Sequence, residues 1–118
     1  MVECAYTCLW EYEVSEEWVE VFERQYGPAG EWARLFRLSP DYIETLLLKD
    51  RAVSGRYLTV DRWRSEEAYR AFKSAYAVQY AKLDSECERL TSAERSLGAF
   101  SELSSGHSFR PNHLRGSA

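Results

Sequence analysis

The segment RYLTVDRWRSEEAY, Arg56 to Tyr69, predicts a strand that runs directly into a helix. Its first half contains the β-branched and large apolar side chains that suit a half-buried sheet. Because side chains alternate along an extended strand, one face carries four of them: Tyr57, Thr59, Asp61 and Trp63. Ser65 is a typical N-cap residue, and two glutamates follow it where a helix favours negative charge. Polar and aromatic groups therefore concentrate at this junction, which is the candidate functional site.

Patterns that predict further strands and helices lie on both sides of this segment. Ala5 to Val14 alternates and predicts a strand with one strongly apolar face, which includes Trp10. Further strands are predicted over Tyr42–Lys49, Arg56–Trp63 and Arg95–Leu103. Apolar residues at helical spacing predict a helix that Ser15 caps and Gly27-Pro28 ends, a short helix around Trp32–Phe36, and one long helix from Glu66 to about Leu90. Gly55 ends the loop before the third strand and is available for a positive φ.

This order of elements, β-α-β-β-α-β with one small extra helix, predicts an α+β, ferredoxin-like domain with an antiparallel sheet. Two helices cover one face of such a sheet. Large side chains on both faces of the first strands predict that the other face packs against a partner, most economically a second copy of the chain. We therefore expect a homodimer.

Length and composition bound the protein further. A chain of 118 residues is the size of one domain, which we expect over residues 1–103, with a flexible tail over 104–118, where Ser, Gly, Pro, Asn and Arg dominate. The net charge of −4 argues against a nucleic-acid partner, and no apolar run reaches the length of a membrane span. Three cysteines without a signal peptide fit a reducing, cytoplasmic location.

The sequence lacks the usual motifs for cofactors. Both histidines, His107 and His113, lie in the tail, and their spacing suits no helical metal pair. No glycine-rich dinucleotide motif and no P-loop occur. We therefore expect no metal and no cofactor, so that catalysis would depend on acids, bases and aromatic groups or on pocket shape.

Each candidate residue has two interpretations. Asp61 is either a carboxylate with a raised pKa that acts as a base, or one half of an ion pair with Arg62, Arg64 or a lysine. Trp63 either orients a planar substrate or belongs to the core. Glu11, also in a strand, is expected to be exposed at a sheet edge.

The motif W-x-S-E-x-A-Y-R, present as Trp63 to Arg70, resembles the antibiotic-biosynthesis monooxygenase domain family of the dimeric α+β barrel superfamily. The resemblance covers roughly Ala5 to Leu103, and YGPAGEWARLF, Tyr26 to Phe36, is similar to a segment of other members. It implies that Trp63 and Tyr69 line a substrate pocket. Thr59 stands where quinone-forming members have an asparagine. The arginine of the later helix has no clear match, and the chain lacks the helix histidine and first-strand asparagine of haem-degrading relatives.

The resemblance implies a cofactor-independent monooxygenase in which an ionised small aromatic, quinol or polyketide-like substrate reduces O2 directly. The alternative is a non-catalytic dimeric module of the same fold that binds a small ligand or a protein. We predict an apolar cavity between Trp63 and Tyr69. The predicted catalytic residues are Trp63, Tyr69 and Asp61, and the predicted substrate-binding residues are Thr59, Tyr57, Trp10 and Phe72.

Overall fold

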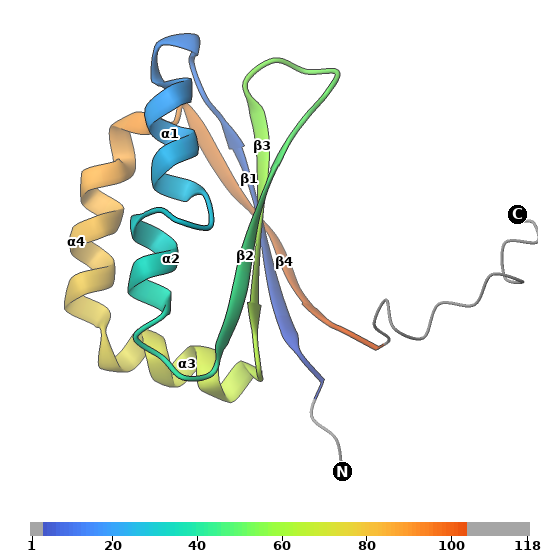
Figure 1. Ribbon diagram of the computed structural model, residues 1–118, viewed down its shortest axis with the longest axis vertical. Coiled ribbons are helices and arrows are strands. Elements are labelled where there is room, and N and C mark those ends of the chain that lie inside the picture. The colour runs from blue at the N-terminus through green and yellow to red at the C-terminus, as the bar shows by residue number, and fades with distance from the viewer. Residues whose placement is uncertain (1–3, 104–118) are drawn as a thin grey trace, which may run out of the picture.

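A computed structural model describes residues 4–103 of the chain (Figure 1). Its elements are β1 (Tyr6–Glu13), α1 (Val19–Tyr26), α2 (Glu31–Phe36), β2 (Tyr42–Lys49), β3 (Arg56–Trp63), α3 (Glu66–Ala75), α4 (Ala77–Cys87) and β4 (Ala93–Ser101), with short 3-10 turns η1 (Glu16–Trp18) and η2 (Glu88–Leu90). The predicted flexible tail over 104–118 lies outside the described residues and stays a prediction.

The four strands form one antiparallel sheet in the order β2-β3-β1-β4. Figure 1 shows α1, α2 and α4 on one side of this sheet, with α3 crossing its lower end. The predicted α+β, ferredoxin-like architecture is confirmed. None of the helices in residues 4–103 is long and apolar enough to cross a membrane.

The strand register decides which side chains face the helices. β1 and β3 pair so that Trp10 lies opposite Thr59 and Cys8 lies opposite Asp61. Thr45 of β2 lies opposite Asp61 on the other side of β3. The alternating side chains of three strands thus meet on one surface, the inner face, as the strand periodicity predicts.

The core fills the space between the inner face and the helices with aromatic rings. Phe22, Tyr57 and Trp63 are its largest fully buried side chains. Phe36 of α2 and Phe72 of α3 both contact the Trp63 ring, at centroid distances of 5.4 and 5.0 Å. Tilted and edge-to-face contacts of this kind add to the stabilisation from burial alone.

The prediction of one long helix from Glu66 to Leu90 is wrong, because the helix breaks at Tyr76, whose φ and ψ are −116° and 32°. A straight helix of 25 residues would be about 37 Å long, whereas an eight-residue strand spans only about 26 Å. The break lets α3 cover the end of β3 while α4 returns along the inner face (Figure 1).

The local signals around the turns have mixed outcomes. Ser65 caps α3 by accepting a hydrogen bond from the Ala68 amide at 3.1 Å, and Gly55 has a φ of +80°, so both predictions are confirmed. Ser15 makes no side-chain cap, and a 3-10 turn follows it instead. β4 begins at Ala93 rather than Arg95, because its pairing with β1 already starts with Ala93 opposite Glu13. The register of this strand pair shifts between Leu9 and Trp10.

The opposite side of the sheet, the outer face, is uncovered in residues 4–103 (Figure 1). Three large apolar side chains are exposed along it: Leu46, Leu48 and Phe100.

Ion pairs flank these apolar side chains on the outer face. Arg56 and Arg95 both bind Glu11 at one end, and Arg62 binds Glu44 and Glu102 at the other. Glu11 is only 6% exposed. Its predicted edge position is wrong, because β1 is a central strand.

Candidate functional site

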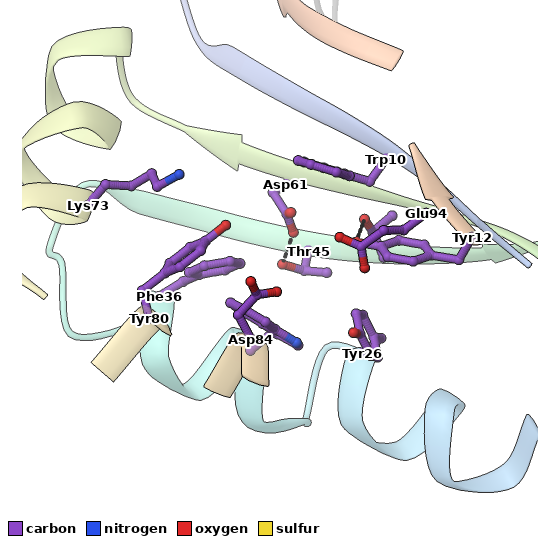
Figure 2. Close-up of a pocket in the computed structure, with 12 residues that line it drawn as sticks. Trp10, Tyr12, Tyr26, Phe36, Thr45, Asp61, Lys73, Tyr80, Asp84 and Glu94 are labelled. Carbon is purple, nitrogen blue, oxygen red and sulfur yellow. Dashed lines mark hydrogen bonds between the residues drawn. The ribbon is translucent and has the colours of Figure 1, made fainter. Parts of the chain in front are cut away.

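A cavity of about 250 Å³ lies between the inner face and the helices (Figure 2). Strands β1, β2, β3 and β4 supply one wall, and helices α1 to α4 supply the other. The aromatic lining residues are Trp10, Tyr12, Tyr26, Trp32, Phe36 and Tyr80. The polar lining residues are Thr45, Thr59, Asp61, Lys73, Asp84 and Glu94. A concave surface with aromatic walls and convergent polar groups is the usual form of a small-ligand site.

Asp61 is the central polar group of the cavity. Tyr42 donates a hydrogen bond to the Thr45 hydroxyl at 2.7 Å, and Thr45 donates to the Asp61 carboxylate at 2.6 Å. Burial raises the pKa of Asp61 to about 6, and the bond from Thr45 offsets part of that rise. Asp61 is therefore a stronger base than an ordinary aspartate and is mostly ionised at neutral pH.

The ion-pair interpretation of Asp61 is wrong. Both neighbouring arginines point away from the cavity, because Arg62 lies on the outer face and Arg64 pairs with Asp41 beyond the strand end. Within residues 4–103 no lysine or arginine forms an ion pair with Asp61. Its carboxylate thus keeps capacity to accept a hydrogen bond or a proton from a ligand.

Of the other predicted site residues, Trp10 and Thr59 also line the cavity. Trp10 is partly exposed, and Figure 2 shows its ring on the strand wall beside Asp61. Thr59 is 3% exposed, and its hydroxyl makes a long contact of 3.5 Å with the Tyr12 hydroxyl. Three residues of the predicted set, Asp61, Thr59 and Trp10, therefore meet at one cavity.

The predicted cavity between Trp63 and Tyr69 does not exist, because the two rings contact each other edge to face at 5.3 Å. Trp63 is completely buried, and its indole N–H has no hydrogen-bond partner in the described part of the chain. Phe72 is buried against Trp63, and Tyr57 is buried with its hydroxyl donating to Glu23. Trp63, Tyr69 and Phe72 form the aromatic wall behind the cavity, whereas Tyr57 packs on Phe22 at the other end of β3. None of these four predicted site residues lines the cavity.

Sequence reasoning missed the helical side of the cavity. Tyr80 and Asp84 lie four residues apart on α4, which places them on one side of that helix, and Lys73 comes from α3 on the other side of the break at Tyr76. The spacing of Tyr80 and Asp84 was a readable signal beside the apolar stripe. Glu94 carried no comparable signal, because only its pairing with Tyr12 brings it to the cavity.

Charge at the cavity is unbalanced. Burial raises the pKa of Glu94, and the nearby negative charges of Asp84 and Glu88 raise it further. Burial and the charge of Asp84 raise the pKa of Tyr80 to about 12, so this phenol stays protonated. The Lys73 ammonium lies over the Tyr80 ring, 4.5 Å from its centroid.

Comparisons with known proteins give matches at the level of structure. No protein-family model matches the chain, and no curated protein matches it. A structure of SnoaB, a cofactor-independent oxygenase from Streptomyces nogalater, is similar with a TM-score of 0.58 at 19% identity, covering 87% of this chain and 97% of SnoaB.

A second similar structure is the monooxygenase from the gene ActVA-Orf6 of Streptomyces coelicolor, in complex with the ligand nanaomycin D. Its TM-score is 0.63 at 14% identity, over 86% of this chain and 90% of that one. Identities this low establish shared architecture and do not transfer an activity. The chain therefore has the fold of the antibiotic-biosynthesis monooxygenases.

Proposed function

We propose that the protein is a cofactor-independent monooxygenase that oxidises a small aromatic, quinol or polyketide-like substrate with O2. The observation that carries the proposal is Asp61, a desolvated carboxylate without an ion-pair partner in the described residues, which faces an aromatic-walled cavity. A base with a pKa near the working pH is suited to taking a proton from a phenolic hydroxyl.

In the proposed reaction a substrate hydroxyl donates its proton to Asp61, and the resulting electron-rich ring reduces O2. One oxygen atom of O2 becomes a new ring carbonyl, and the other leaves as water with the two displaced hydrogens. The walls contribute by stacking on the ring and by excluding bulk water. Thr45, held by Tyr42, orients the Asp61 carboxylate.

We propose direct contact with the substrate for Asp61, Thr59 and Trp10. Trp63 and Tyr69 would act as positioning residues, because their rings support the β3 end and the start of α3 behind the cavity. Phe72 would have the same supporting role through its contact with Trp63, and Tyr57 would support the other end of β3 through its contact with Phe22.

Oxygen uptake with a panel of hydroquinones tests the proposal. Asp61→Asn keeps the shape and the Thr45 contact but removes the base, so turnover should fall by about 100-fold or more. Asp41→Asn is the matched control, because Asp41 pairs with Arg64 outside the cavity. Wild-type turnover should increase as the pH rises through about 6. Equal turnover by Asp61→Asn and the wild type would contradict the assigned role.

The alternative function is a non-catalytic module that binds a small ligand. Thr59 supports it, because the Thr59 hydroxyl contacts Tyr12 where quinone-forming relatives have an asparagine. Tight ligand binding without oxygen uptake across the whole panel would favour this alternative.

We also propose that the protein is a homodimer formed through the outer face. Leu46, Leu48 and Phe100 are 44%, 46% and 52% exposed there, and a second copy would cover them. A stable dimer buries about 1,200 Å² or more in total. Light scattering at micromolar concentration should give twice the chain mass of 13.7 kDa. A monomer mass would overturn this proposal.

A further inference from the structure

Strand β2 is irregular beside the cavity. Its pairing with β3 shifts register between Tyr42 and Glu44, so Ile43 has no partner on β3. In a regular strand Ile43 and Thr45 would share one face, and Tyr42 would point to the other. The bulge reverses this order: Tyr42 lies on the inner face with Thr45, and Ile43 is 42% exposed. Bulges of this kind re-aim side chains and are common next to active sites.

The bulge makes a hydrogen-bond chain to Asp61 possible. The Tyr42 hydroxyl donates to Thr45 Oγ1 at 2.7 Å, and Thr45 donates to Asp61 Oδ1 at 2.6 Å. Thr45 is only 4% exposed, so water competes little for its hydroxyl. Because its oxygen accepts the bond from Tyr42, its single hydrogen is directed to Asp61. Each bond in such a chain polarises and strengthens the next.

Tyr42 makes this contact from outside the cavity. Thr45 and Asp61 line the cavity, whereas Tyr42 does not. The Tyr42 ring packs against Phe36 of α2 and Trp63 of β3, at centroid distances of 5.5 and 5.3 Å. These two rings hold the phenol in place behind Thr45. A ligand in the cavity can therefore contact Asp61 without contacting Tyr42.

We propose that Tyr42 is a positioning residue that controls Asp61 from outside the cavity. Tyr42 fixes the Thr45 hydroxyl, so that Thr45 occupies Oδ1 of the carboxylate. The other oxygen, Oδ2, accepts no hydrogen bond within residues 4–103 and is left for a ligand. The inference rests on the proposed role of Asp61 as a base and goes beyond it. The bulge in β2, which touches no ligand, then sets the pH range in which that base works.

The hydrogen bond from Thr45 lowers the pKa of Asp61 and partly offsets burial, which raises that pKa to about 6. Loss of this bond should therefore raise the pKa of Asp61 further. Burial also raises the pKa of Tyr42, so Tyr42 stays protonated and remains a donor at neutral pH.

Other titratable groups around Asp61 do not confuse this comparison. Burial raises the pKa of four of them, so they stay neutral at neutral pH: Cys8, Tyr12, Tyr69 and Tyr80. Three charged side chains also line the cavity: Lys73, Asp84 and Glu94. All seven are the same in each variant of Tyr42 or Thr45, so their effects cancel when variants are compared.

A carbon-13 NMR titration of the Asp61 carboxyl group in the full chain tests the inference without substrate or oxygen. Thr45→Val should raise the pKa by about one pH unit or more, and Thr45→Ser should restore the wild-type value. Tyr42→Phe should raise the pKa by about 0.3 or more, because it weakens the remaining bond. In the Thr45→Val background Tyr42→Phe should have no further effect, since its influence passes through the Thr45 hydroxyl.

Tyr76→Phe is the matched control, because Tyr76 also packs in an aromatic cluster, against Phe72, and does not line the cavity. It should leave the pKa of Asp61 unchanged, and circular dichroism should show that all variants remain folded. An unchanged pKa in Tyr42→Phe, or an equal effect of Tyr42→Phe with and without the Thr45 hydroxyl, would overturn the inference. If the pKa shifts as expected but the pH dependence of hydroquinone turnover does not follow it, or no turnover occurs, the inference stands and the proposed catalytic role of Asp61 fails.

Discussion

The two faces of the sheet use charge in opposite ways. On the outer face each carboxylate of the two clusters has an arginine partner, so hydrogen bonds from arginine lower the pKa of Glu11 and of Glu102. On the inner face Asp61 has only a threonine partner in the described residues, and burial raises its pKa to about 6. The outer face is arranged for stability, whereas the inner face retains an unneutralised acid beside a cavity.

The contrast shows where a functional residue is to be sought. A structural carboxylate is paired, and its ionised form stabilises the fold. Desolvation of a carboxylate without an ion-pair partner costs stability, so such a group beside a cavity marks a candidate functional site. By this criterion Asp61 differs from Glu11, although both project from neighbouring central strands.

The largest expected effect concerns the wall behind the cavity. Trp63→Ala removes a completely buried ring in contact with Phe36, Tyr42, Tyr69 and Phe72, so the free energy of unfolding should fall by about 3–5 kcal/mol. Urea denaturation measures this. Val78→Ala, at a 78% exposed position of α4, is the control and should leave the stability nearly unchanged. A loss below about 1 kcal/mol for Trp63→Ala would show that the core tolerates a cavity there.

The next largest effect is a gain in stability at neutral pH when Asp61 is replaced by asparagine. Asp61 binds a proton more tightly when folded, so the free energy of unfolding should fall as the pH rises from about 4 to 6. At about 1.4 kcal/mol per pKa unit, the two-unit rise costs on the order of 3 kcal/mol at neutral pH. Asp61→Asn should recover part of this cost at pH 7 and should flatten that pH dependence. Urea titrations at pH 4.5 and 7 would reveal it, and unchanged stability at both values would refute it.

Leu48→Glu should have a smaller effect on stability and a clear effect on the mass of the protein in solution. A charge on the exposed outer face should separate the proposed dimer and halve the mass seen by light scattering. Because Leu48 is 46% exposed in the single chain, the monomer itself should change by no more than about 0.5 kcal/mol. Val78→Glu, at a 78% exposed helical position, should leave the mass unchanged.

The smallest effect concerns the outer ion pairs. Glu102→Gln weakens the contact with Arg62, and partly exposed pairs of this kind contribute about 0.2–1 kcal/mol. Because the pKa of Glu102 is lowered in the folded protein, its contribution is present near neutral pH and is lost as the pH falls. The wild type and the variant should therefore converge in stability at acidic pH. A difference that grows on acidification would contradict the pairing.

The sequence by itself determined the order of the elements, the cap at Ser65, the φ at Gly55 and the face that Asp61 shares with Thr59. These features follow from local periodicity and local backbone chemistry, which the neighbouring residues settle. Three-dimensional packing alone decided the break at Tyr76, the burial of Trp63 and the place of the cavity. One straight helix would extend past the end of the sheet, so the chain turns at Tyr76 and α4 runs back along the inner face. That turn brings Asp84 to the same space as Glu94, and no pattern along the chain encodes their proximity.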